Sequence, residues 1–225
     1  LGYMARALRA PGMAPDSGVA IELHLPQSSK RIDFTLTGYG ESGEKNAVLV
    51  ELKQWSSSKL TGKDAIVVTA LGKGLNETVH PSYQAWSYAS LLEGFNEAVY
   101  AQAILLRPCA YLHNYTRDGV IDSPHYQGYI DKAPLFLKGK DELEQLRGFI
   151  RKYIHTGDNK AVLYELANGR IRPSKALADA LTGLLKGNPE FVLIDDQKQV
   201  YEAALAAAKT ASSEQKRVLI IEGGP

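Results

Sequence analysis

Apolar residues alternate with polar ones over short stretches near the N-terminus, which predicts β-strands there. Residues 19–25 alternate and end at Pro26, and residues 32–37 form a second stretch. Residues 47–52 are apolar on consecutive positions, as is typical of a central strand that is covered on both faces. The polar segment GYGESGEKN, with its glycines, separates the last two stretches, so we expect a hairpin within a meander.

Helical spacing of apolar residues follows further along the chain. The stretch HPSYQAWSYASLLEG predicts a helix with Pro81 in its first turn and Gly94 at its end. Residues 141–154 carry an apolar stripe that predicts an amphipathic helix. The other predicted elements are a helix before Pro11, a strand and hairpin turn within residues 65–74, helices over residues 174–185 and 195–211, and strands over residues 98–106, 191–194 and 216–225. This mixture of strands and helices predicts an α/β protein.

The composition is that of an ordinary globular protein, with 44% hydrophobic and 23% charged residues among 225. The formal net charge is only +1, so nucleic-acid binding would depend on a local basic patch. The single cysteine, Cys109, excludes an internal disulfide and zinc sites built on cysteine pairs, and it favours a cytoplasmic setting. No apolar run is long enough for a membrane span and no signal-peptide segment is evident. Because the chain begins without methionine, we expect it to be a fragment.

Three charged residues interrupt the predicted hairpin. Glu51 and Lys53 are two apart on one strand and share a face, and Asp33 lies on the neighbouring strand. Two carboxylates at neighbouring strand ends provide the hard oxygen ligands that suit Mg²⁺ or Mn²⁺. A lysine beside them can position a water molecule or stabilise charge on a phosphate. The pattern indicates phosphodiester hydrolysis; the alternative is an exposed hairpin with a chance Asp and a Glu–Lys pair.

The helix that begins near Pro81 adds two polar candidates. Gln84 and Tyr88 are four residues apart and therefore share one face, distinct from that of Ala85 and Ala89. We expect this face to lie towards the acidic residues or the substrate. The alternative is the solvated face of an amphipathic helix.

Together these residues resemble the PD-(D/E)xK, or restriction-endonuclease-like, nuclease superfamily over roughly residues 19–107. RIDFTL supplies the Asp, VELKQW supplies the Glu-x-Lys, and QAWSY is similar to the Gln-x-x-x-Tyr helix of RecB-like members. The resemblance implies a core with a mixed central sheet flanked by helices, followed by a helical connector. It implies that Asp33, Glu51 and the backbone carbonyl of Leu52 bind the metal, while Lys53 assists the water. It also implies supporting roles for Gln54, Gln84, Tyr88 and Glu22.

The C-terminal end resembles the beginning of a second functional unit. KRVLIIEGGP is similar to the strand and first glycines of a Walker A loop, and FVLIDDQKQVYEAAL is similar to the glutamine motif of superfamily 1 helicases. The resemblance is to bacterial proteins that join such a nuclease to a Schlafen group 3-type DNA/RNA helicase domain. It implies that ATP binds only to a full-length parent protein, which continues beyond Pro225 and supplies the missing lysine. The residues of this chain that would contribute to ATP binding are Gln197, Gly223, Gly224 and Pro225. A terminal turn is the alternative for EGGP.

These observations predict a nuclease-like domain in residues 1–135, a helical connector in 136–190 and the start of a P-loop NTPase domain in 191–225. The predicted function is metal-dependent hydrolysis of DNA or RNA within a larger nuclease–helicase protein. Two alternatives stay open. The first is a nucleic-acid-binding module with an inactive site, and the second is an ATP-driven motor in which this domain only guides the nucleic-acid strand. A phosphate-binding groove requires a local concentration of cations, for which the candidates are Lys30, Arg31, Lys53, Lys59 and Lys63.

Overall fold

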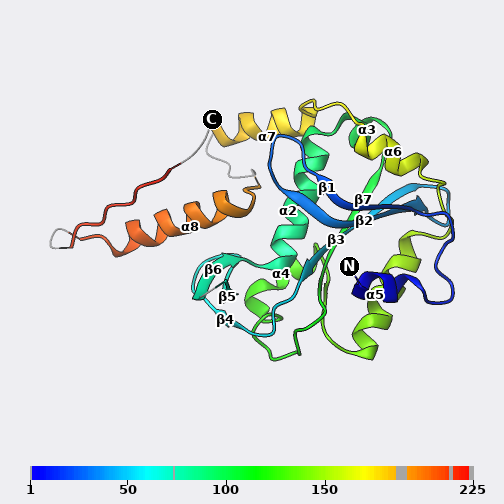
Figure 1. The fold of residues 1–225 in the computed structure, drawn as a ribbon. Helices are drawn as coiled ribbons and strands as arrows, with labels where there is room; N and C mark the ends of the chain where they lie inside the picture. The colour runs from blue at the N-terminus through cyan, green and yellow to red at the C-terminus, as the bar shows by residue number, and fades with distance from the viewer. Residues whose placement is uncertain (1, 73, 186–191, 213–214, 223–225) are drawn as a thin grey trace.

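The computed structural model of the chain describes residues 2–72, 74–185, 192–212 and 215–222 (Figure 1). A five-stranded sheet with the strand order β1-β2-β3-β7-β8 lies at its centre. Strands β1, β2 and β3 pair antiparallel, whereas β7 pairs parallel with β3 and with β8. The α/β fold with a mixed central sheet is therefore confirmed. The strands are β1 (Gly18–His24), β2 (Arg31–Tyr39), β3 (Lys45–Lys53), β7 (Leu105–Leu112) and β8 (Leu135–Phe136).

A smaller antiparallel sheet follows β3 in the chain. Gly72 has a φ of +62° in the turn between its last two strands, which fits the predicted hairpin. Val67 in this sheet packs against Trp55 and Leu112, so apolar contacts hold it against the end of the central sheet. Its strands are β4 (Ser58–Leu60), β5 (Ile66–Leu71) and β6 (Gly74–Val79).

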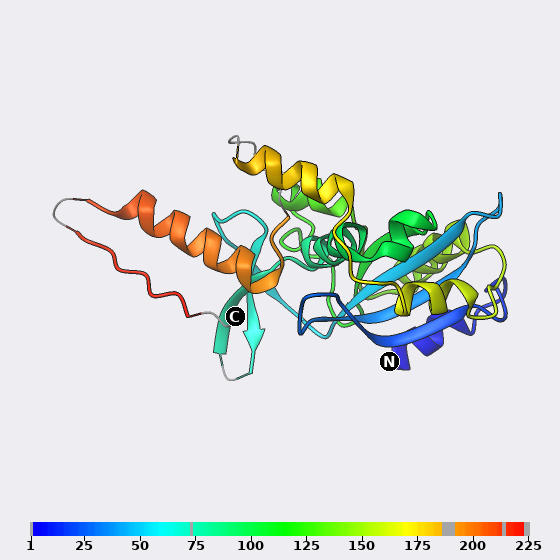
Figure 2. The same ribbon diagram turned by 90° about the horizontal axis from the view of Figure 1, so that it is seen from above.

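Helices cover both faces of the central sheet, as Figures 1 and 2 show. Successive residues of β3 point to opposite faces: Val48 packs with Ile150 of α5, and Leu49 packs with Leu92 of α2. Helix α1 joins α5 on the first face, and α6 joins α2 on the second. The helices are α1 (Gly2–Leu8), α2 (Pro81–Phe95), α3 (Glu97–Ala101), α4 (Gln127–Ile130), α5 (Lys140–Tyr153), α6 (Ala161–Ala167), α7 (Lys175–Leu185) and α8 (Asp195–Thr210), with a 3-10 turn at Pro124–Tyr126. In the described part of the chain, no helix has the length and apolar character that a membrane crossing requires.

The predicted strand over residues 98–106 is wrong in its first half. The side chain of Asn96 accepts a hydrogen bond from the backbone N–H of Ala98, which caps α3. Strand β7 begins only at Leu105. The apolar run is thus shared between a short helix and a strand, and local capping decides where one ends.

Two predicted strands near the C-terminus are also wrong within the described residues. Residues 192–194 have no strand; the carbonyl of Leu193 instead accepts a hydrogen bond of 2.5 Å from the Tyr83 hydroxyl. Residues 216–222 form no strand either, and Val218 and Ile220 are 86% and 80% exposed. A strand needs a neighbour for its backbone groups, and the described residues supply none here.

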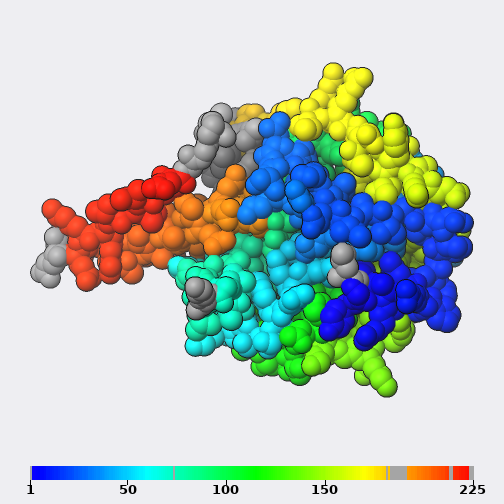
Figure 3. All heavy atoms as spheres, in the orientation of Figure 1, coloured from blue at the N-terminus to red at the C-terminus, as the bar shows by residue number. Residues whose placement is uncertain are grey.

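Helices α7 and α8 form the helical C-terminal part that the sequence predicts. Figure 3 shows α8 (orange) and the segment after it (red) projecting from the rest of the molecule, while the start of α8 lies against it. The predicted connector of residues 136–190 also contains α5 and α6, and Leu146 and Val162 of these helices belong to the two main core clusters. These two helices therefore complete the faces of the sheet on which the candidate site depends.

His80 fixes the start of α2. Its Nδ1 accepts a hydrogen bond of 3.2 Å from the backbone N–H of Ser82, and its Nε2 donates one of 2.8 Å to the carbonyl of Ile121. The imidazole is fully buried and stacks on Tyr126. Burial lowers the pKa of His80 from 6.5 to about 4, so the ring stays neutral at neutral pH.

We predict that His80→Ala lowers the free energy of unfolding by about 1–3 kcal/mol at pH 7.5, because the cap is lost and the Ile121 carbonyl is left unpaired. The pKa of His80 is lower in the folded chain, so its stabilisation is complete above 6.5 and is lost as the pH falls to about 4. Urea unfolding of both proteins across this range should show their difference shrinking towards acid. A constant difference, or an equal effect of the exposed His24→Ala, would contradict the assignment.

Candidate active site

Asp33 and Glu51 lie where β2 and β3 stop pairing. The last pair of residues in this ladder is Phe34 and Val50, so Asp33 and Glu51 are the next residue of each strand. A carboxylate oxygen of Asp33 accepts a hydrogen bond of 2.8 Å from the backbone N–H of Leu52. The Asp33 side chain thus takes the place of the next backbone hydrogen bond of the ladder and holds the ends of β2 and β3 together.

The neighbouring ladder is interrupted at the same level. Strands β1 and β2 pair at Ile21–Phe34 and at Leu23–Ile32, but Glu22, which faces Asp33 in this register, has a φ of +54°. The pairing continues to His24–Arg31 in the same register, so β1 lacks only the pair that would face Asp33. The sheet therefore opens at Asp33 on the side of β3, where the ladder with β2 ends.

Glu51 is buried and paired with Lys53. One Glu51 oxygen accepts a hydrogen bond of 2.7 Å from Lys53 Nζ, and only 4% of the Glu51 surface is exposed. Burial raises the pKa of Glu51 to about 7; the charge of Lys53 opposes this rise, while Asp33 adds to it. Burial is the largest single influence on Lys53 and would lower its pKa, but the carboxylates of Glu51, Asp33 and Asp195 together outweigh burial and raise the pKa. The Glu51 carboxyl therefore ionises around neutral pH, and its negative charge stands fully beside the Lys53 ammonium only above neutral pH.

Helix α2 brings Gln84 and Tyr88 to the same place. The amide nitrogen of Gln84 donates a hydrogen bond of 2.9 Å to the Tyr88 hydroxyl, and that hydroxyl donates to a carboxylate oxygen of Asp195. Burial, followed by the charge of Asp195, raises the pKa of Tyr88, so its hydroxyl keeps its proton and acts as a donor. The helix face predicted from the i,i+4 spacing therefore looks into the site rather than into solvent.

These side chains line one open, polar cleft with a volume of about 470 Å³. It is lined by both cationic and acidic groups, and among the described residues the ring of Tyr88 is the only apolar surface that lines it. The cleft is suited to a charged, hydrated ligand rather than to an apolar one. Its lining residues are Glu22, Ser29, Lys30, Arg31, Asp33, Glu51, Lys53, Gln84, Tyr88 and Asp195.

Some of the predicted residues lie elsewhere. Gln54 follows the last residue of β3, is exposed and does not line the cleft. Glu22 reaches only the exposed rim, where it pairs with Arg31 at 2.6 Å. Lys59 and Lys63 belong to the region of the small sheet, so of the five expected cations only Lys30, Arg31 and Lys53 line the cleft.

Gln197 lies on α8 and is exposed, and its side-chain oxygen accepts a hydrogen bond of 3.2 Å from the backbone N–H of Ile194. It therefore caps the helix in this structure. Gly223, Gly224 and Pro225, which complete the predicted nucleotide-binding set, lie outside the described residues.

Asp195 is a site residue that the sequence did not indicate. It is the first residue of α8, far along the chain from β3, and only 5% of its surface is exposed. Its carboxylate accepts from Tyr88 and lies 3.5 Å from Lys30 Nζ. In the sequence it precedes another aspartate at a helix start, where acidic residues are common, so no local signal distinguishes it.

The donor set fits a divalent cation in one specific respect. Glu51 Oε2 and Asp195 Oδ1 are buried and have no hydrogen-bond partner, which is costly for a carboxylate unless a cation is bound. No group of three His, Cys, Asp or Glu side chains converges tightly enough to hold a metal by itself within the described ranges. A backbone carbonyl, as expected for Leu52, and water would therefore complete any coordination shell.

Comparisons of the chain with protein-family models, with curated protein sequences and with solved structures gave no match. The functional interpretation therefore depends on the geometry of the cleft.

We predict that Glu51→Gln changes the pH dependence of stability in metal-free buffer. The pKa of Glu51 is higher in the folded chain, so its contribution to stability is complete below 4.5 and is lost as the pH rises through about 7. Glu51→Gln removes this pH-dependent loss. Between pH 4.5 and about 7, the free energy of unfolding of the variant should therefore rise relative to that of the wild type by roughly 3 kcal/mol, since one pKa unit corresponds to about 1.4 kcal/mol. Urea unfolding with EDTA present measures both curves. Parallel curves would show that the carboxyl is not buried as described.

Proposed function

We propose that this chain is a divalent-cation-dependent nuclease that hydrolyses phosphodiester bonds of DNA or RNA. The observation that carries the proposal is the buried Glu51 carboxylate, held beside Asp33 and ion-paired with Lys53 where β2 and β3 separate. The position of these three residues at the end of a mixed sheet supports a restriction-endonuclease-like core. The cationic lining supports a phosphate-bearing ligand.

Asp33, Glu51 and the carbonyl of Leu52 are the groups that would hold the cation. Bound Mg²⁺ or Mn²⁺ would polarise the phosphoryl oxygens and lower the pKa of water. Lys53 holds a positive charge in the cleft, where it positions the attacking water and offsets the charge that develops on the phosphate. Hydrolysis forms a bond between the water oxygen and phosphorus, breaks the bond to the leaving oxygen, and transfers a proton to that oxygen.

Lys30 and Arg31 would bind the phosphates that flank the scissile bond. They are neighbours in the chain, both line the cleft, and their charged groups lie near its surface, with side-chain exposures of 32% and 48%. Contacts of this kind carry no sequence information, so the proposal includes no base specificity. Gln84 would keep the Tyr88 hydroxyl in place beside the acidic groups.

A larger nuclease–NTPase protein is the setting that we propose for this domain. The apolar residues from Val218 to Ile221 are exposed, as expected of a segment that is covered by further structure. Gln197 is exposed, and its side chain would exchange its capping bond to Ile194 for an adenine when ATP binds to the parent protein. A second candidate function, an inactive nucleic-acid-binding module that guides an NTPase, has the same cleft but no cleavage.

We predict that the wild-type chain cleaves labelled nucleic acid with Mg²⁺ or Mn²⁺ and not with EDTA. Single- and double-stranded DNA and RNA are tested in parallel. Glu51→Gln and Lys53→Met should each reduce cleavage at least 100-fold, because each removes a group that stabilises charge in the transition state.

The ion pair of Lys45 and Glu165 provides a matched control. Lys45 begins β3 and pairs with Glu165 of α6 at 2.6 Å, outside the cleft. Lys45→Met and Glu165→Gln therefore remove the same charges from the same strand and its partner helix. Cleavage by these controls should match the wild type. Wild-type binding of nucleic acid without cleavage would favour the binding module, and cleavage by Glu51→Gln at the wild-type rate would overturn the assignment.

A further inference from the structure

We propose that Asp195 of α8 supplies a third carboxylate to the cation site of this cleft, in contact with the water shell of the cation rather than as a third direct ligand, so that the site is complete only when α8 is docked against β6 and α2. This inference rests on the proposed function. It adds a residue that lies outside the hairpin and α2, and it makes the C-terminal helix part of the active site.

The Asp195 carboxylate is buried without a full set of hydrogen-bond partners. One of its oxygens accepts from Tyr88, and the other has no hydrogen-bond partner. Glu51, which lines the same cleft, is also buried and also has one oxygen without a partner. Two buried carboxylates with unpaired oxygens in one cleft are costly, and a shared cation removes this cost.

The backbone at Asp195 has an unusual conformation. Its φ of +30° lies in the left-handed region, which residues other than glycine rarely adopt. Such strain persists only where surrounding contacts hold the residue, and it concentrates at functional sites. A regular helix start would not require it, so its presence indicates that the carboxylate is held in a particular place.

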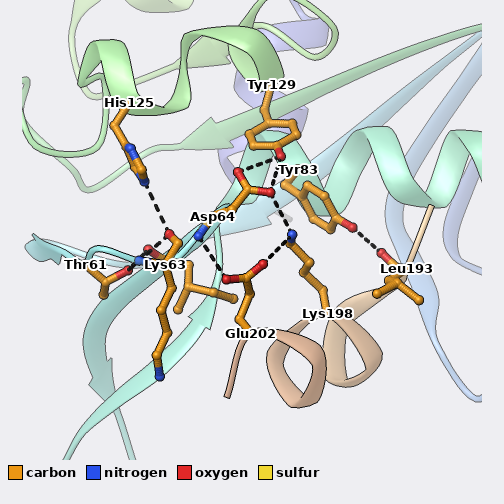
Figure 4. A network of polar contacts seen from close by, with 10 residues as sticks. Thr61, Lys63, Asp64, Tyr83, His125, Tyr129, Leu193, Lys198 and Glu202 are labelled. Atoms are coloured by element: carbon orange, nitrogen blue, oxygen red, sulfur yellow. Dashed lines mark hydrogen bonds and ion pairs between the residues drawn. The ribbon is translucent and has the colours of Figure 1, made fainter. Parts of the chain in front are cut away.

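A network of hydrogen bonds and ion pairs holds α8 in place, as Figure 4 shows. Lys198 Nζ pairs with Asp64 at 2.7 Å and with Glu202 at 2.9 Å, and the Lys198 side chain is buried. The Tyr129 hydroxyl donates to Asp64 at 2.8 Å, and a Glu202 oxygen accepts from the Asp64 backbone N–H at 3.2 Å. The network thus links α8, α4 and the loop before β5.

Lys198 lies one helical turn after Asp195, so this anchor determines where the carboxylate sits. On the other side, the Tyr83 hydroxyl holds the Leu193 carbonyl, two residues before Asp195. Asp195 is therefore fixed from both directions in the chain. Anything that moves α8 would withdraw the carboxylate from the cleft.

Asp196 provides a matched control for Asp195. Both lie in the first turn of α8, where either charge favours the helix dipole, and both lie near Lys30 Nζ. Asp196 differs in that its side chain is 76% exposed and does not line the cleft. If Asp195 acted only as a helix-start residue or as a partner of Lys30, the two substitutions would have similar effects.

The test is calorimetric titration of the full chain with MnCl₂, together with cleavage assays. We expect Asp195→Asn to weaken Mn²⁺ binding at least tenfold, since loss of even an outer partner of a metal ligand typically costs about 10- to 100-fold in affinity. Asp195→Glu keeps the carboxylate and should recover part of the Mn²⁺ affinity. The Mn²⁺ affinity of Asp196→Asn should stay within about twofold of that of the wild type. Lys198→Met, which releases α8 without touching the cleft, should weaken Mn²⁺ binding as well.

The outcomes separate the two proposals. If Asp195→Asn binds Mn²⁺ and cleaves nucleic acid as well as the wild type does, this inference is overturned and the proposed function stays intact. Increased cleavage by Asp195→Asn with unchanged Mn²⁺ affinity would also overturn it, because the carboxylate would then be a competitor of phosphate. A wild type that neither binds Mn²⁺ nor cleaves any of the substrates would overturn both.

Discussion

The ion pair between Glu51 and Lys53 is the interaction on which the candidate site depends. A carboxylate with 4% of its surface exposed would not remain charged without a cation beside it, and Lys53 Nζ lies 2.7 Å from one of its oxygens. A buried pair of this kind is weak evidence for stability, because the desolvation of both charges offsets their attraction. Its position at the end of β3, open to the cleft, is what points to function.

The rest of the fold places this pair and builds the cleft around it. The parallel pairing of β3 with β7 continues past the end of the antiparallel pairing with β2, so the end of β3 has backbone pairing on one side and only the Asp33 side chain on the other. Helix α2 covers the adjacent face and adds Tyr88, and the start of α8 adds Asp195 beside it. The site is therefore assembled from the hairpin, from one helix of the core and from one helix of the C-terminal part.

The sequence predicted the parts of this arrangement that arise from local periodicity. Strand alternation places Glu51 and Lys53 on one face, the hairpin places Asp33 opposite, and helical spacing aligns Gln84 with Tyr88; all five line one cleft. Gln54 was placed less well, because β3 ends at Lys53 and alternation no longer applies beyond it. Asp195 could not be found, since its place depends on tertiary contacts of Lys198 and Tyr83 that leave no local pattern. The strand expected over residues 216–225 is absent from its described part, residues 216–222, for a similar reason, because pairing depends on a neighbour that local sequence does not specify.

We propose that the end of the sheet holds a divalent cation between carboxylates. Diffraction from crystals grown with MnCl₂, measured for the anomalous signal of manganese, shows whether a cation binds there. We expect an anomalous peak within about 2.5 Å of carboxylate oxygens of both Asp33 and Glu51, the range of oxygen–cation distances in such sites. Well-ordered crystals at saturating Mn²⁺ with no peak in the cleft, and Glu51 still paired only with Lys53, would contradict it.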